Sequence, residues 1–257
     1  MGEHGTWFDY LNRFSWWQDV NHWGEQALGR KQLTGMFPTG WSTAHMFVAL
    51  LVVLIVTMGA IAFFRGTRTA DLGIVPPRKM NLRNFFEYLA ESTYGMVEGS
   101  LGAHNAKRFY PLIGALWLFI FFGNLFALIP GFVSSNDTLK TNVGLALLVF
   151  LATHYLGVRE HGLSYFKHFL GPVWWLSPLM LPIELISHLA RPVSLSLRLM
   201  GNMLADHKVV MSFFALVPIV VPLPFLLLGL LVCVIQALVF TSLAMVYIGM
   251  AIEHEEH

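Results

Sequence analysis

The chain has 257 residues and a formal net charge of +1, and 56% of its residues are hydrophobic while only 12% are charged. Soluble domains carry about 25% charged residues, so this composition excludes an ordinary soluble domain and favours a protein of the lipid bilayer. The balanced charge gives no reason to expect a nucleic-acid partner. The single cysteine, Cys233, excludes a disulfide within the chain and is expected to be a small packing or lipid-facing residue.

Residues 1–42 form a polar segment that is rich in tryptophan. The segment holds no short apolar stretch followed by a small-residue cleavage site, so we expect no cleavable signal peptide. Tryptophans that precede a membrane span often lie at the level of the lipid headgroups. We therefore predict a partly ordered interfacial arm, whose tryptophans are Trp7, Trp16, Trp17, Trp23 and Trp41.

Three apolar stretches follow, at residues 43–64, 109–133 and 143–158. About 20 apolar residues are needed to cross a bilayer core, so the first two stretches are long enough and the third is slightly short. Between the first two, residues 81–101 carry apolar side chains on one helix face and charged side chains on the other. This pattern predicts an amphipathic helix on the membrane surface.

The last part of the chain divides at a group of prolines into two helical runs, predicted at residues 178–217 and 225–252. The first run would be roughly 50 Å long at about 1.5 Å per residue. The hydrocarbon core is only about 30 Å thick, so this helix must be strongly tilted. The sequence thus predicts an all-α polytopic integral membrane protein with one membrane domain, 43–257. It should hold about five membrane-embedded helices and a surface helix, and the last two should form a long, strongly tilted hairpin.

The distribution of basic residues predicts the orientation. The segment 65–108 is rich in Lys and Arg, and the segment 159–171 holds Arg159 and Lys167, whereas 134–140 holds only Lys140. The positive-inside rule puts the first two segments in the cytoplasm, so the N-terminus should lie outside and the C-terminus inside. Without a recognisable transit peptide, we expect a bacterial plasma (inner) membrane.

The run from residue 184 carries a row of polar residues within an arc of about 80° on one helix face, which Pro192 could distort by a kink. Each such group costs roughly 2.5–3.5 kcal/mol at membrane depth, which favours a function. The alternative is a set of internal ion pairs, Glu184 with His188 or Arg191, that hold helices together. Arg191 could also reach the headgroups. The members of the row are Glu184, His188, Arg191, Arg198, Asn202 and Asp206.

Arg198 differs from the rest of the row, because it lies deeper and has no carboxylate one turn away. Arginine stays protonated in proteins, so its side chain must be a permanent charge that faces a cavity or a carboxylate of another chain. Arg198 is therefore the residue to which we assign the function.

Residues 191–203, RPVSLSLRLMGNM, closely resemble the signature of subunit a of F-type ATP synthases. Further similarity lies at residues 109–114 (FYPLIG), 123–124 (GN), 129–131 (IPG) and 236–247, so the resemblance extends from about residue 80 to the end. The resemblance implies a stator subunit that faces a rotating ring of subunit c. The other implied partners are the peripheral stalk of subunit b, the rest of the synthase and the lipid bilayer.

In that family the matched arginine, here Arg198, draws the ring carboxylate into its ionised form and blocks a direct leak. Two offset half-channels deliver and remove the ion, so that proton flow requires rotation and drives ATP synthesis. Asn202 and Gln236 match polar positions beside the arginine, with hydrogen-bonding between helices as their alternative role. We find no nucleotide-binding glycine loop, so the chain is expected to be no enzyme on its own and to hold no cofactor and no metal.

The sequence departs from the family at three places, one of which is Asp206, where the family commonly has a small residue. The family often pairs an ionisable residue after position 206 with a second one on the last helix; His207 fills the first place, but the second falls on Gly229. Ala127 replaces an acidic residue of some relatives. We expect Asp206, His207, Glu184 and His188 together to line the outer half-channel, since their side chains suit proton transfer. His207 lies off the polar row of the helix.

The remaining histidines are expected to be interfacial: His45, His104, His154, His161 and His168. The spacing of His254 and His257 does not fit the His-Glu-x-x-His zinc motif. An intramembrane metalloprotease is therefore disfavoured. An autonomous proton channel or secondary transporter stays open as the alternative function, although a transporter would usually show an internal repeat, and none is evident.

Overall fold

The computed structural model describes residues 14–28, 43–68, 82–129, 132–162, 177–216 and 222–252. Within these ranges the regular structure is helical throughout, which confirms the all-α fold. The helices, in chain order, are α2 (Ser15–Leu28), α3 (Thr43–Arg68), α4 (Leu82–Ala127), α5 (Leu139–His161), α7 (Ser177–Leu216) and α8 (Pro222–Ile252).

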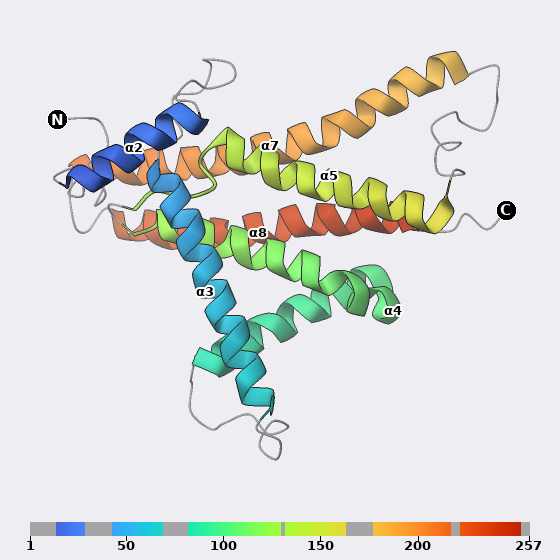
Figure 1. The fold of residues 1–257 in the computed structure, drawn as a ribbon, viewed down its shortest axis with the longest axis horizontal. Helices are drawn as coiled ribbons and strands as arrows, with labels where there is room; N and C mark the ends of the chain where they lie inside the picture. The colour runs from blue at the N-terminus through green and yellow to red at the C-terminus, as the bar shows by residue number, and fades with distance from the viewer. Residues whose placement is uncertain are drawn as a thin grey trace.

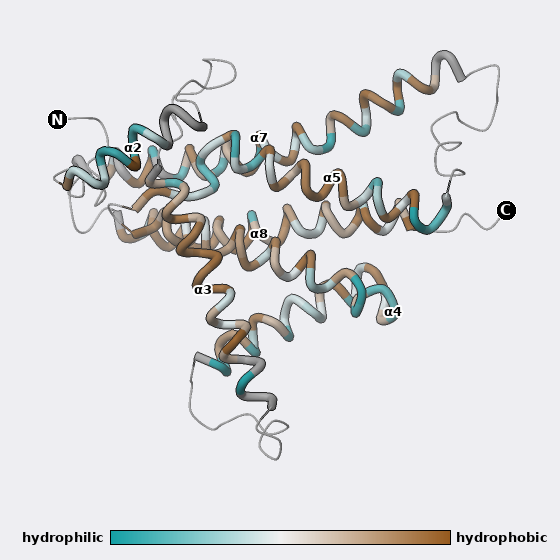
Figure 2. The backbone as a smooth tube through the Cα atoms, viewed as in Figure 1, coloured by the Kyte–Doolittle hydropathy of each residue, from teal (hydrophilic) through white to brown (hydrophobic). Residues whose placement is uncertain are grey.

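Four of the described helices, α3, α4, α5 and α8, are long and apolar enough to cross a membrane. The chain is therefore a polytopic membrane protein, as predicted. The helix α7 is also long but is not one of these four, and charged residues recur along it. Figure 2 shows the contrast: apolar residues dominate α3 and α8, whereas polar residues recur along α7.

Three helices, α5, α7 and α8, run side by side along the long axis of the molecule, and α3 crosses their direction steeply (Figure 1). The helix α7 packs on both α5 and α8, and α8 also packs on α4. The end of α5, the start of α7 and the end of α8 all lie toward the same end of the long axis. Since α3 and the α7–α8 pair run in such different directions, they cannot both follow the membrane normal.

The helix α4 is bent at Gly102, whose backbone has φ 78° and ψ 157°. A positive φ costs glycine little because glycine has no Cβ. Two helical arms, at residues 82–101 and 103–127, therefore meet at a non-helical residue, close to where the expected surface helix ends. The arms meet where the Tyr110 hydroxyl donates to the Ala90 carbonyl over 3.1 Å. The second arm ends at Ala127, earlier than the predicted end at 133.

The main core lies where α4, α5, α7 and α8 meet. Ile120 of α4, Leu199 of α7 and Ala237 of α8 are all fully buried there, and Phe240 is 1% exposed. Cys233 of α8 is also buried, at 1% exposed, so it is a packing residue. This core fixes the rotation of α7 about its own axis and thereby decides which of its side chains face outward.

Candidate functional site

Arg198 lies on the outward face of α7. Its neighbours on the inner face, Leu195 and Leu199, are 3% and 0% exposed and pack in the main core, whereas Arg198 is exposed. Among the described residues Arg198 has neither an ion-pair partner nor a hydrogen-bond partner. A guanidinium remains charged, so α7 presents a permanent positive charge to whatever lies against this face.

One turn beyond Arg198, Asn202 joins α7 to α8. The Asn202 side-chain amide donates a hydrogen bond to the Gln236 side-chain oxygen over 2.6 Å. Gln236 is 2% exposed, while Asn202 lies on the exposed face with Arg198. The structure therefore brings together these two sequence-predicted residues and places their bond beside the arginine.

A second polar group lies near the start of α7. His188 Nε2 is 3.3 Å from Glu184 Oε1, so of the two pairings left open for Glu184 the structure has the one with His188. The side chain of His188 is 9% exposed. Arg191, which follows in the row, instead places its guanidinium over the Tyr247 ring of α8, 5.1 Å from the ring centroid.

His154 of α5, which was expected to be interfacial, joins this group. Its ring centroid lies 5.3 Å from that of His188, with the two rings nearly perpendicular. Both rings line a cavity of about 20 Å³ between α5, α7 and α8. The polar lining residues are Thr153, His154, His188, Arg191 and Tyr247. This contact could not be predicted from the sequence, because it depends on how α5 packs against α7.

Asp206 lies on the other side of Arg198 along α7. It is half-buried, and its Oδ2 atom has no hydrogen-bond partner in the part of the chain that the structure describes. His207 is part of the same helix, but its side chain lies outside what the structure describes.

Glu184 and Asp206 are about 33 Å apart along α7, at about 1.5 Å per residue. The helix is continuous between them, through Pro192. The four residues expected to line one half-channel therefore form two separate groups. Glu184 and His188 lie on one side of Arg198, and Asp206 and His207 lie on the other.

Packing explains why position 229 holds glycine and not the ionisable residue that the family often has there. Gly229 of α8 is buried, and a Cβ added to it would lie 2.6 Å from Leu128 Cδ2 at the end of α4. An ionisable side chain at this position would have to displace Leu128. The position that often holds the second ionisable group of the family is thus occupied here by an apolar contact.

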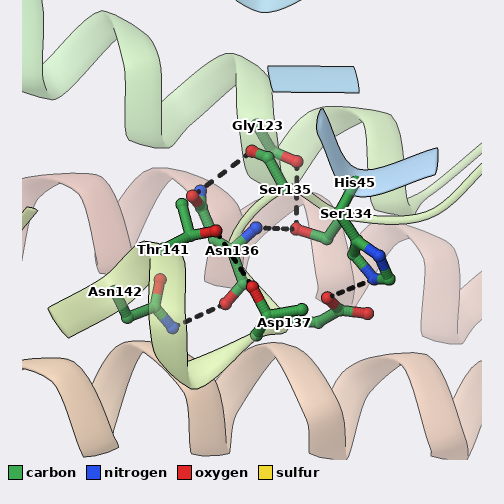
Figure 3. A network of polar contacts seen from close by, with 9 residues as sticks. His45, Gly123, Ser134, Ser135, Asn136, Asp137, Thr141 and Asn142 are labelled. Carbon is green, nitrogen blue, oxygen red and sulfur yellow. Dashed lines mark hydrogen bonds and ion pairs between the residues drawn. The ribbon is translucent and has the colours of Figure 1, made fainter. Parts of the chain in front are cut away.

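A buried polar network between α4 and α5 was missed by the sequence analysis, which treated residues 134–140 as a short external loop (Figure 3). The Asn136 side chain donates to Asn124 Oδ1 over 2.8 Å, and the Asn142 side chain donates to the Asn136 carbonyl over 2.7 Å. Their neighbours in this network are also at most 5% exposed: Ser134, Ser135, Asp137 and Thr138.

His45 at the start of α3 contacts this network through Asp137. Its Nε2 atom lies 2.9 Å from Asp137 Oδ1, and the two side chains are 6% and 7% exposed. The side chain of His45, which was expected to be interfacial, is therefore buried against Asp137. The dense run of small polar residues directly after a span was the available signal, because irregular backbone at membrane depth must be buried in protein or line water.

No group of three His, Cys, Asp or Glu side chains within the described ranges could hold a metal ion. Trp7, Trp41, His168, His254 and His257, which the sequence analysis singled out, lie outside the described residues.

Comparison with known proteins identifies the family. The family described as ATP synthase A chain matches residues 45–249. ATP synthase subunit a 2 of Syntrophotalea carbinolica is 48% identical over 204 residues, which are 79% of this chain and 83% of that protein. ATP synthase subunit a of Geobacter sulfurreducens is 46% identical over 210 residues, covering 82% and 86% of the two chains. The corresponding protein of Bdellovibrio bacteriovorus is 40% identical over 216 residues, covering 82% and 94%. The chain therefore belongs to the family of ATP synthase subunit a.

Proposed function

We propose that the chain is the ion-translocating stator subunit of a rotary F-type ATP synthase and that Arg198 faces the ring of subunit c. The family supports membership of such a complex. The observation that carries the role of Arg198 is its exposure on a core-packed helix, without an ion-pair partner among the described residues. A permanent charge in lipid is costly, so a carboxylate of another subunit is its natural partner.

In this proposal Arg198 draws each passing ring carboxylate into its ionised form. The same charge prevents a proton from crossing directly between the two half-channels. Proton flow is thereby coupled to rotation, and the nucleotide chemistry is done by other subunits. The bond between Asn202 and Gln236 holds α8 against α7 beside Arg198, which limits movement of the arginine toward or away from the ring.

The two polar groups on α7 correspond to two half-channels. With the N-terminus outside, as the basic residues predict, the start of α7 lies toward the cytoplasm. Glu184 and His188 then line the inner path, and Asp206 and His207 line the outer path. This replaces the expectation that all four line the outer path. Arg198 lies between the groups, about 21 Å from Glu184 and about 12 Å from Asp206 along the helix.

The arrangement of the helices supports a strongly tilted hairpin. If α3, the span over Ala44–Ala62, crosses the membrane close to its normal, then α7 and α8 must lie far from it (Figure 1). Tilted helices of this length offer a long edge to a ring in the same membrane. The implied partners are the subunit c ring, the subunit b stalk and the surrounding lipid. We place the complex in a bacterial inner membrane, with the C-terminus of this chain in the cytoplasm.

The N-terminal arm fits the outer headgroup region in this orientation. Trp17 of α2 is 2% exposed and packs on Phe47 of α3, with 4.7 Å between the ring centroids. Trp16 and Trp23 are 54% and 64% exposed. Amphipathic tryptophan rings prefer the membrane interface. Since α2 is attached to the first turns of a span, its exposed tryptophans would lie at that level.

The test is the replacement of Arg198 in the assembled synthase. Arg198→Ala should abolish ATP-driven proton pumping into inverted membrane vesicles, while the complex still purifies with its ring. Lys208→Ala is the matched control, since Lys208 is another exposed cation on α7, and it should pump normally. Arg198→Lys should also fail or be severely impaired, because a desolvated lysine can lose its proton.

Normal pumping by Arg198→Ala would contradict the proposal. A purely structural arginine would give a different result, in which the alanine variant fails to assemble and the lysine variant largely restores function. The autonomous channel or transporter has no observation in its favour, and co-purification with a ring would exclude it.

A further inference from the structure

His154 is held in one orientation by its own helix. Its Nδ1 atom lies 2.9 Å from the carbonyl oxygen of Phe150, one turn earlier in α5. A carbonyl oxygen can only accept a hydrogen bond, so Nδ1 carries a proton and donates it to this bond. In the neutral ring the other nitrogen, Nε2, is then left without a proton. Nε2 is therefore the atom at which His154 can take up and release a proton.

The cavity beside His154 leads to the Glu184–His188 pair. Its volume of about 20 Å³ exceeds the roughly 10–15 Å³ that one water molecule needs. A buried water also needs two to four polar partners. Most of the lining surface is apolar, and the lining residues with polar side chains include His154, His188 and Arg191. The His188 ring reaches the cavity from α7, and its Nε2 atom contacts Glu184 over 3.3 Å.

We propose that His154 is a proton-carrying residue of the inner ion path, linked to His188 and Glu184 by a water molecule in this cavity. The inference rests on the proposed function, because it needs an inner path. A proton from this water binds Nε2 of His154 and forms an imidazolium. The same proton then leaves Nε2 for another water molecule at the same edge of the ring, and the neutral imidazole returns. Nδ1 keeps its bond to Phe150 throughout, so the residue starts each cycle in the same tautomer.

The charged and titratable groups that face His154 come from two neighbouring helices. The helix α7 contributes His188 and Arg191, and α8 contributes Tyr247, while Glu184 of α7 contacts His188. Arg191 keeps a permanent positive charge over the Tyr247 ring, and Glu184 supplies a negative charge on the far side of His188. The path therefore has a carboxylate at one end and imidazoles along it, which are groups that pass protons near neutral pH.

The variant that tests this is His154→Asn in the whole synthase. The asparagine amide can donate to the Phe150 carbonyl as Nδ1 does, but it offers no basic nitrogen. ATP-driven proton pumping would be measured in inverted vesicles while the pH of the medium, which bathes the cytoplasmic face, is varied. We expect a loss of about ten-fold in rate and a pH dependence of the rate that differs from that of the parent. His104→Gln, which changes an exposed histidine of α4, should keep the rate and profile of the parent.

A parent-like rate and pH profile in His154→Asn would overturn the inference. So would an equal loss of rate at every pH, because a packing role predicts that result. His154→Gln is the second variant, and failure of both to assemble with the ring would show a structural residue and also overturn it. If the parent vesicles did not pump at all, the proposed function itself would fail, and this outcome is distinguishable from the others.

Discussion

Asn202 of α7 donates a hydrogen bond to Gln236 of α8 over 2.6 Å, one turn along α7 from Arg198. Replacement of either residue by alanine should lower ATP-driven proton pumping, because α8 would no longer be held beside the arginine. The double variant should be little worse than either single variant, since both remove the same bond. Hydrogen bonds between membrane helices couple by about 0.6 kcal/mol on average and at most about 1.7. A double-mutant cycle on unfolding free energy in detergent would measure this coupling.

The control for this cycle is Ser212→Ala. The Ser212 hydroxyl donates only within α7, to the Lys208 carbonyl over 2.8 Å. Combined with Gln236→Ala, it should give additive changes. Additive changes for Asn202 and Gln236 as well would show that their bond does not contribute to stability.

Gly123 is predicted to be essential for the buried network between α4 and α5. A Cβ at this position would lie 2.5 Å from Ser135 Oγ and 2.7 Å from Asn136 Nδ2. Asn136 cannot move away cheaply, because its side chain is bonded to Asn124. We expect Gly123→Ala to lower the unfolding free energy by about 1–3 kcal/mol, the usual cost of overpacking.

The matched control is Gly144→Ala in α5, where nothing lies within 4 Å of an added Cβ. This change should be neutral or slightly stabilising, because alanine favours helix over glycine by up to about 1 kcal/mol. Detergent unfolding followed by circular dichroism would compare the two variants. Equal stability of both would show that the network is looser than the contacts imply.

The ends of α7 and α8 fall close to those expected from the sequence, because prolines and apolar runs are local signals. The polar row on α7 was recognised for the same reason. Its division into two groups was not, since a helical wheel records direction around the axis and not distance along it. The roles of His45 and His154 also could not be predicted, because each depends on a residue from another element, Asp137 or His188.

The orientation of the chain can be tested at two exposed histidines. His22 of α2 and His104 of α4 should lie on opposite sides of the membrane, with position 104 in the cytoplasm. Single cysteines at these positions, in a Cys233→Ala background, would be labelled with a membrane-impermeant maleimide in sealed vesicles of known orientation. Position 137, in the predicted external loop, is unsuitable because Asp137 is 5% exposed. Labelling of both cysteines from the same side would overturn the orientation.

Asp206 is predicted to carry protons in the outer path without an ionisable partner at position 229. Its Oδ2 atom is buried and has no hydrogen-bond partner among the described residues. A hydrogen bond to Oδ2 from one of these residues therefore does not account for a carboxylate at this position. Asp206→Asn keeps the shape but cannot titrate, and should lower ATP-driven proton pumping about ten-fold or more. Asp206→Glu should retain much of the activity, because it keeps a carboxyl in place. Both variants should assemble with the ring, since neither loses a bond that holds helices together. If the asparagine variant pumps like the parent, the outer path does not pass Asp206. If the glutamate variant loses as much pumping as the asparagine variant, the size of the side chain at position 206 matters and its charge does not.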